Sequence, residues 1–478
     1  SLRFKIALVG FFGGANIFIQ RSNLSIAIVC MVNHTAVDEL ILSQTDLYWN
    51  SSRDNLNAAA HQNETSDGEF VWTKETQGLL LGAVFWGYVI FQMIGGLIVE
   101  KVGLRHGVGP FIILLSILTF LSHPAALWSP WALFAVRFLL GVTCAVCMPG
   151  LFFLLSNWAP LEEKSRFTSI VFNGNVVGNA VIFPIAGLLC SHGFAGGWPS
   201  IFHVSGIFSF VCSIMWYIFV YDTPDEHPFI SCAERDYIKS SLEMKKSTIQ
   251  MKTPWCSIIT SIPVYAVVCA HISTSWGLYL MLSNLPMYMR EILKFDATSN
   301  GLFTMLPYIC MSMALLLYGL ALDKLTKRFG HSISRRSSAA LDFILGMILP
   351  AVLMIGISYL DCQYAVLSIA FLCVTIACFS LLFSGVLVNV FDIAPRYAGQ
   401  IMTFSNTLSN ITGIITPYAV AKFTPNNTLA EWQKVFFLSA GIIGLGGILF
   451  IIFAKTEVQK WAIEQSENDS KKIEVTKY

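Results

Sequence analysis

The sequence predicts an all-α integral membrane protein whose twelve transmembrane helices form two six-helix bundles. Its composition is the first observation: 55% of the 478 residues are hydrophobic and 12% are charged, against roughly 25% charged in soluble domains. Twelve apolar runs, each long enough to cross a bilayer, are the second observation. A motif repeated in both halves of the chain is the third. This composition excludes an ordinary cytosolic enzyme, a disordered chain and a disulfide-stapled secreted module.

The spans are expected where apolar residues continue for about 20 positions, the length of a helix that crosses a bilayer core of ~30 Å. The first run is too long for the core of a signal peptide and has no cleavage-site flank, so it counts as a span. In chain order, the predicted spans are 6–32, 76–99, 107–128, 131–155, 167–190, 199–220, 257–287, 301–322, 338–358, 364–390, 399–421 and 433–454.

These spans group into an N-terminal bundle over 1–220 and a C-terminal bundle over 255–456. A long loop at 33–75 follows the first span. A linker at 221–254 carries a capping-box pattern that predicts a short polar helix. A polar tail occupies 457–478.

The positions of Lys and Arg predict the orientation. The connections after even-numbered spans carry 15 of these residues and the opposite loops carry 6, so both termini are expected in the cytoplasm. Glycosylation sequons at Asn33, Asn50, Asn63 and Asn426 then fall outside, whereas the sequon at Asn23 lies inside a span and is a chance match. The membrane is expected to be the plasma membrane or a lysosomal or vesicular membrane.

A short motif, glycine followed four residues later by an acid and a base, occurs after the second span of each half. The acid could latch neighbouring helices together, or the glycine could serve close packing while the bases follow the charge rule. Two copies in equivalent places favour a two-bundle transporter with its site between the bundles. The motif residues are Gly96, Glu100 and Lys101 in the first half and Gly319, Asp323 and Lys324 in the second.

Two arginines lie inside predicted spans, whereas no Asp or Glu lies well inside any span. Arg21 lies roughly 16 Å from either end of the first span, and Arg137 lies about 9 Å into the fourth. Buried charges in a membrane usually serve function, and guanidinium groups pair with carboxylates or phosphates. The alternatives are a backbone-satisfied Arg21 and an Arg137 that snorkels to the interface. His271 in the seventh span is expected to pack against other helices, with proton coupling as the alternative.

Uncharged polar residues gather in several spans. We predict that six of them line the binding site together with the two arginines, although hydrogen bonds between helices would also explain such residues. They are Tyr88, Ser275, Tyr279, Asn389, Ser405 and Asn406.

Most of the 12 cysteines lie inside apolar runs, where they are interpreted as small buried hydrophobic residues; Cys30 is one of them. Cys144 and Cys147 have C-x-x-C spacing but no His or acidic neighbours that would hold zinc. No metal and no cofactor are therefore expected. A net charge of +1 gives no indication of a nucleic-acid partner.

Four sequence blocks carry a family resemblance: RSNLSIA at 21–27, FWGY at 85–88, WAPLEEKSR at 158–166 and DIAPRYA at 392–398. Over nearly its whole length the chain resembles the anion transporter family of sialin, the vesicular glutamate transporters and the type I sodium–phosphate transporters, within the major facilitator superfamily. The resemblance implies alternating access and arginines in the first and fourth spans that meet the anion. Arg21 and Arg137 occupy those motif positions.

The chain departs from its proton-coupled and glutamate-carrying relatives. Acids that follow the fourth-span arginine in proton-coupled relatives are replaced by Leu140 and Cys144. Glutamate carriers have His, Arg and His where this chain has Leu81, Thr274 and Val390. These departures resemble the phosphate/urate-type branch.

We therefore expect a secondary transporter of small organic or inorganic anions, driven by voltage or linked to sodium, with dependence on Na⁺ or Cl⁻ to be tested. It is expected to work as a monomer in the lipid bilayer. One alternative is a proton-coupled, sialin-like exporter of acidic sugars or acidic amino acids. A membrane-embedded transferase is the alternative of another class, but the spans lack the acid–base cluster that such an enzyme needs.

Overall fold

The computed structural model describes residues 2–37, 39, 68–160, 163–243, 253–329, 344–395, 397–455 and 457–463. The described part is helical apart from turns, loops and one isolated bridge between Val32 and Phe70. Its N-terminal half contains α1 (Leu2–Met31), α3 (Lys74–Val102), α4 (Leu104–Trp128), α5 (Pro130–Trp158), α6 (Lys164–His192) and α7 (Trp198–Phe219). Its C-terminal half contains α10 (Ile262–Glu291), α11 (Ala297–Phe329), η2 (Ile344–Ile348), α13 (Leu349–Ile357), α14 (Ala365–Ile393), α15 (Ala398–Phe423) and α16 (Leu429–Phe453).

The structure confirms a fold of twelve membrane-spanning helices. Ten described helices are long and apolar enough to cross a membrane. The other two spans are the shorter apolar segment Ile344–Ile357 and α15, whose serine, threonine and asparagine residues lower its hydropathy. The ninth predicted span, 338–358, is described only from residue 344 onward.

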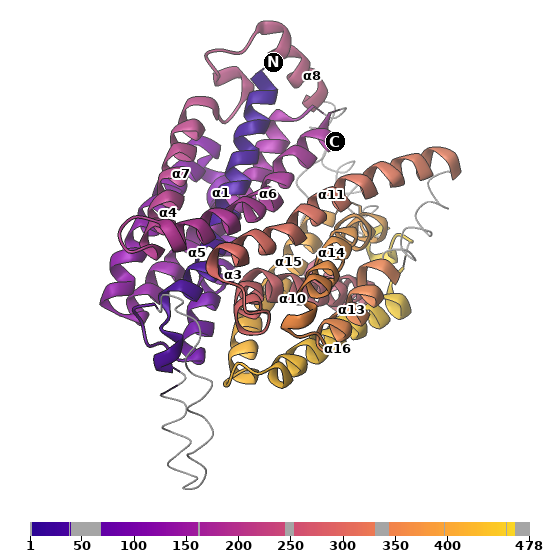
Figure 1. Cartoon of the computed structure of the whole chain (residues 1–478). Coiled ribbons are helices and arrows are strands. Elements are labelled where there is room, and N and C mark those ends of the chain that lie inside the picture. The colour runs from indigo at the N-terminus through magenta and orange to yellow at the C-terminus, as the bar shows by residue number, and fades with distance from the viewer. Residues whose placement is uncertain are drawn as a thin grey trace, which may run out of the picture.

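The two halves lie side by side, with α3 and α15 where they meet (Figure 1). Helix α1 begins and α16 ends on the same face of the molecule, which we call the terminal face. This is the face that the charge pattern predicts to be cytoplasmic. The other end of the helices is called the opposite face.

The linker between the halves packs against the N-terminal half at the terminal face. It includes η1 (Pro224–Glu226) and α8 (Cys232–Glu243), and α9 (Trp255–Thr260) follows it before α10. The Glu234 carboxylate accepts hydrogen bonds from the backbone N–H groups of Leu2 (3.0 Å) and Arg3 (3.1 Å). These donors are among the first amides of α1, which have no partner within the helix. The linker helix therefore caps the first transmembrane helix.

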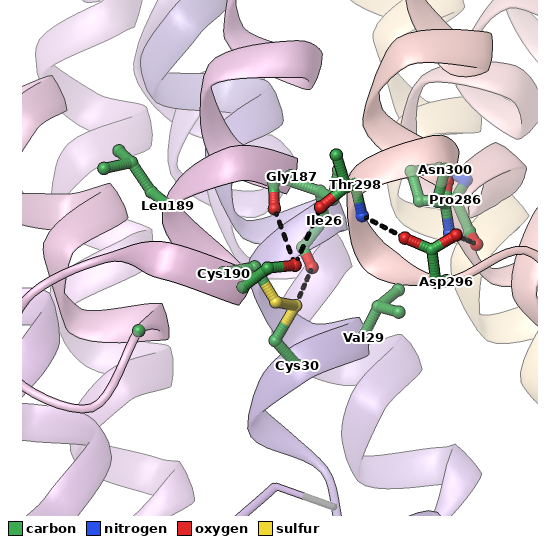
Figure 2. Close-up of a disulfide and its surroundings, with 12 residues drawn as sticks. Ile26, Val29, Cys30, Gly187, Leu189, Cys190, Pro286, Asp296, Thr298 and Asn300 are labelled. Carbon is green, nitrogen blue, oxygen red and sulfur yellow. Dashed lines mark hydrogen bonds between the residues drawn. A yellow bond between two sulfur atoms is a disulfide. The ribbon is translucent and has the colours of Figure 1, made fainter. Parts of the chain in front are cut away.

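A disulfide between Cys30 and Cys190 joins α1 to α6 near the opposite face (Figure 2). The interpretation of Cys30 as a buried hydrophobic residue is therefore wrong, because sequence spacing cannot reveal that a partner 160 residues away lies beside it. Disulfides form in oxidising compartments, which agrees with a non-cytoplasmic opposite face. Beside the bridge, Ser191 and Thr298 share a hydrogen bond of 2.9 Å, so the joined edge of α1 and α6 adjoins α11 of the other half.

Candidate functional site

Arg21 lies at the junction between the two halves, near the middle of α1. Its residue surface is only 8% exposed. The guanidinium carbon lies 4.7 Å from the ring centre of Phe85 and 4.8 Å from that of Tyr88, both on α3. Tyr279, on α10 of the other half, is 5.7 Å away. Ring faces attract a cation but do not cancel its charge.

The hydrogen bonds of Arg21 all cross to the C-terminal half. Its Nη2 donates to the Tyr279 hydroxyl and to Asn410 Oδ1, each at 3.4 Å, which is long for such a bond. The Tyr279 hydroxyl donates to the same Asn410 oxygen at 2.5 Å. The Arg21 Nε has no partner among the residues that the structure describes. Among the described residues, the salt bridges do not include Arg21, so its charge is buried without a counter-charge.

Arg137 is placed differently, inside the N-terminal half, where it is fully buried. Its Nη1 donates to the Gln20 carbonyl at 3.0 Å and to Asn23 Oδ1 at 2.8 Å, both on α1. Its guanidinium lies 5.0 Å from the ring centre of Phe202, and in the described part of the chain its Nε and Nη2 have no partner. Snorkelling is excluded by this burial. The sequence left open that Arg21 is satisfied by main-chain carbonyls, but it is Arg137 that makes such a contact, with the Gln20 carbonyl.

Behind these arginines, α1 carries a buried polar network that sequence reasoning missed. Gln20 Nε2 donates to Asn16 Oδ1 (3.2 Å) and to the Ser205 carbonyl (2.8 Å), and Asn16 donates to Ser209 at 3.0 Å. Asn23 Nδ2 donates to Gln20 Oε1 at 3.2 Å. Their spacing of four and three residues, which places them on one helix face, was the available signal. The network fixes α1 on either side of Arg21.

Of the predicted polar residues, Tyr88, Tyr279 and Asn406 come together around Arg21. The Tyr88 hydroxyl lies close enough to the Asn406 side chain to interact with it. Asn406 Oδ1 in turn accepts from Asn410 Nδ2 at 3.1 Å. Ser275 is buried one helical turn before Tyr279. Both halves therefore contribute to this group.

Three other predicted residues, His271, Ser405 and Asn389, make their hydrogen bonds away from Arg21. His271 Nδ1 lies 2.8 Å from Ser405 Oγ, and His271 Nε2 lies 3.3 Å from Ser409 Oγ, so these residues pair α10 with α15. Asn389 donates to the Lys455 carbonyl at 3.0 Å near the terminal face. It holds the segment that follows α16.

The first copy of the repeated motif lies where α3 turns into α4. Glu100 and Lys101 are exposed, and a Cβ added to Gly96 would meet nothing within 4 Å, so this glycine is not needed for close packing. Asp222 holds the turn instead, accepting from the Leu104 amide and, at 3.1 Å, from the Arg105 amide. The side chains of the second copy, Gly319, Asp323 and Lys324, lie outside those that the structure describes.

The predicted glycosylation sites are described in part. Asn33, just after α1, receives the Ala36 amide on its Oδ1 at 2.8 Å. Asn426, between α15 and α16, is exposed and donates to Glu431 Oε1 at 2.7 Å. Asn50 and Asn63 lie outside the described residues.

A buried ion pair joins the two halves toward the opposite face. Lys74, at the start of α3, pairs with Glu291 at the end of α10. Their side chains are 6% and 4% exposed. The second oxygen of Glu291 accepts from Trp432 Nε1 at 3.0 Å. The neighbouring Arg290 donates to the Val29 carbonyl of α1. We call the pair Lys74–Glu291 the outer latch.

Tight backbone contacts extend this closure around the outer latch. A Cβ at Gly78 would lie 2.8 Å from the Pro417 carbonyl oxygen, and a Cβ at Gly301 would collide with the Phe183 carbonyl. The rings of Phe183 and Tyr308 stack with centres 5.3 Å apart. The halves are thus closed toward the opposite face. Arg21 and the residues around it, which we call the Arg21 group (Tyr88, Tyr279, Asn406 and Asn410), lie between this closure and the terminal face.

Comparisons with known proteins agree with this architecture. The family model described as Major Facilitator Superfamily matches residues 10–417. Human sialin is 34% identical over 97% of this chain and 91% of its own length. A Drosophila melanogaster protein provisionally named an inorganic phosphate cotransporter is 34% identical over 99% and 88%. Vesicular glutamate transporter 3 of Danio rerio is 33% identical over 98% and 76%.

A solved structure shares the fold. The inward open conformation of the xylose transporter XylE from E. coli has a TM-score of 0.69 with 12% identity and covers 98% of this chain and 99% of its own. The chain therefore belongs to the Major Facilitator Superfamily, among relatives that include sialin and the vesicular glutamate transporters; it is a transporter and not an enzyme.

Proposed function

We propose that this protein is an alternating-access carrier of small anions that bind at Arg21. The observation that carries the proposal is a buried guanidinium at the meeting point of both halves, which within the described chain has no partner for its Nε and forms no salt bridge. Its two hydrogen bonds are long and go to neutral groups, so a carboxylate or phosphate would gain stronger charge-assisted bonds. The names of the glutamate and phosphate relatives also refer to anions.

Arg137 is proposed to support the same anion from behind. Both guanidiniums are buried, so an anion at Arg21 would also be attracted by the positive charge of Arg137 in this low-dielectric region. Arg137 also holds Gln20 and Asn23, which flank Arg21. Direct contact between the anion and Arg137 would use its Nε and Nη2, which have no partner among the described residues, and would require α1 to shift.

The transport cycle then follows from the two closures. In the conformation described here the outer latch is formed, and the anion would exchange with the terminal face. Opening the other side must separate Lys74 from Glu291 and draw Arg21 away from Tyr279 and Asn410. An anion that binds groups from both halves would help to bring them together again.

The proposed driving force is the membrane potential, alone or with sodium. One elementary charge that moves through 100 mV gains ~2.3 kcal/mol. The proton-coupled alternative relied on His271, but both ring nitrogens of His271 face serine hydroxyls rather than Arg21. Cytoplasmic termini, a monomer and a plasma, lysosomal or vesicular membrane belong to the same proposal.

The first prediction concerns the charge of Arg21. In liposomes, Arg21→Gln should lower uptake of the best anion among labelled phosphate, urate, glutamate and sialic acid by roughly 100-fold, because a charged hydrogen bond is worth about 3 kcal/mol. Arg21→Lys should give an intermediate rate of uptake, because lysine keeps the positive charge but lacks the forked N–H donors of the guanidinium. Lys434→Gln, which removes an exposed charge from α16, is the matched control. Full uptake by Arg21→Gln would refute the site.

The second prediction concerns the driving force. Uptake of the same anion should rise severalfold when a potassium diffusion potential favours anion entry, because the spans provide no acid beside Arg21 to carry a compensating proton. Replacing Na⁺ by choline and Cl⁻ by gluconate separates the ion requirements. Strong uptake from a pH gradient, with no response to voltage, would contradict this prediction.

The third prediction concerns the outer latch. Glu291→Gln should favour separation of the halves at the opposite face, because removing one partner of a buried ion pair costs about 3–5 kcal/mol. Trp131 and Tyr364 are both exposed at that face, so spin labels on Trp131→Cys and Tyr364→Cys can be introduced after the exposed cysteines are replaced by serine. Pulsed electron paramagnetic resonance then measures the distance between the two labels. The distribution should gain a longer component.

The charge-swapped pair Lys74→Glu with Glu291→Lys is the control for the outer latch. It should return the distance toward the wild-type value, whereas each reversal alone should lengthen it. An unchanged distribution in Glu291→Gln would show that the ion pair does not hold the halves together.

The fourth prediction concerns pH at the opposite face. Burial, together with the nearby charges of Arg290 and Lys74, lowers the pKa of His34 to about 3. Protonation is therefore resisted in the closed state, whereas a hydrated His34 would titrate near 6.5. Closure should be fully stable above pH 6.5 and lose stability as pH falls from 6.5 toward 3. The same spin labels should separate between pH 7 and pH 5, and His34→Gln should reduce this response; an equal response in both proteins would exclude His34.

A further inference from the structure

A pocket of about 490 Å³ lies at the terminal face of the C-terminal half and shares no lining residue with the site around Arg21. It forms where α9 bends into α10 and where the chain leaves α16. Asn389, which donates to the Lys455 carbonyl, and Ile393, whose carbonyl accepts from the Gln459 amide at 2.9 Å, hold the segment after α16 against the bundle. The wall of the pocket is therefore built by defined contacts.

Two buried polar groups in the wall lack partners within the described chain. Ser261, the N-cap of α10, is 8% exposed, and its hydroxyl makes no hydrogen bond. An N-cap hydroxyl ordinarily accepts from the second or third helical N–H. Here the second residue is Pro263, which has no N–H, and the Val264 amide donates to the Ser261 carbonyl at 3.1 Å. Trp461 Nε1 is the other unpartnered group.

The electrostatics of the pocket favour an anion. The N-terminus of the 30-residue α10 opens onto it through Ser261, Ile262 and Pro263, and helix N-termini carry partial positive charge. Lys455 also lines the pocket, and none of the lining residues that the structure describes is an Asp or Glu. A helix terminus, a lysine and two orphan groups that can donate hydrogen bonds together match a phosphate group.

The rim of the pocket indicates the source of that phosphate. Ile262 and Ile452 are each 62% exposed and Phe453 is 43% exposed. They lie at the ends of membrane-spanning helices, where exposed apolar side chains contact acyl chains. A ligand with a phosphate head and an apolar body satisfies both parts of the pocket at once.

We propose that this pocket binds the headgroup of an anionic phospholipid in the leaflet at the terminal face. The phosphate would accept from Ser261 Oγ and Trp461 Nε1, both buried in the described conformation, once these side chains turn toward the pocket. It would pair with Lys455, while the acyl chains lie along Ile262 and Phe453. Basic pockets at such interfaces recognise anionic lipids. Because the bound lipid would bridge the start of α10 to the end of α16, it would stabilise the C-terminal half.

The test uses the full chain purified in an uncharged detergent. Microscale thermophoresis measures binding of dihexanoyl phosphatidylglycerol, dihexanoyl phosphatidylcholine and inorganic phosphate. Phosphatidylglycerol should bind at least tenfold more tightly than either of the others. Lys455→Ala and Ser261→Ala should each weaken it severalfold, and Lys460→Ala, an exposed lysine outside the lining, should not. Unfolding temperatures without lipid should be unchanged, since Ser261 makes no capping bond.

Each outcome decides the proposal. Equal binding of phosphatidylglycerol and phosphatidylcholine, or equal weakening by Lys460→Ala, would overturn the site. Binding of inorganic phosphate as tight as that of phosphatidylglycerol would overturn its assignment to lipid. Loss of anion transport in Arg21→Gln with intact lipid binding would leave this site standing, because the two sites share no residue.

Discussion

The uncompensated charge of Arg21 is the constraint around which the centre of this membrane protein is built. A guanidinium in the middle of a span costs free energy unless its surroundings satisfy it. Aromatic faces from α3 and α10, with a tyrosine and an asparagine from the C-terminal half, satisfy it in part. Because those partners belong to both halves, the state of the charge and the separation of the halves are coupled. An anion at Arg21 would therefore act on conformation as well as occupy a site.

Arg137 and the outer latch show how other buried charges are satisfied. Arg137 is tied to α1 by a carbonyl and an amide oxygen, which makes it a fixed part of the N-terminal half. Lys74 and Glu291 neutralise each other across the halves. Among the described residues, Arg137 is thus a buried cation fixed within one half, Lys74 and Glu291 form an ion pair that must break for the halves to separate, and Arg21 is a cation whose partner is proposed to be the cargo.

The sequence was sufficient for the twelve spans, the two halves and the depth of Arg21, because hydropathy and the 1.5 Å rise of a helix determine them. Contacts between distant spans could not be read in the same way. Lys74 and Glu291 lie just beyond the predicted spans, where Lys74 counted only as a loop charge, and nothing in the pattern of Cys30 pointed to Cys190. Asn389 has the polar side chain expected of a site residue, but its helix places it near the terminal face.

Equilibrium binding of an anion to the purified protein tests the central claim most directly, since it does not depend on the driving force or on turnover. Isothermal titration of wild-type protein with the best anion of the panel should give saturable binding that is lost in Arg21→Gln while the unfolding temperature of the variant is retained. Equal affinity in the two proteins would mean that the charge of Arg21 is satisfied within the protein and that the anion binds elsewhere.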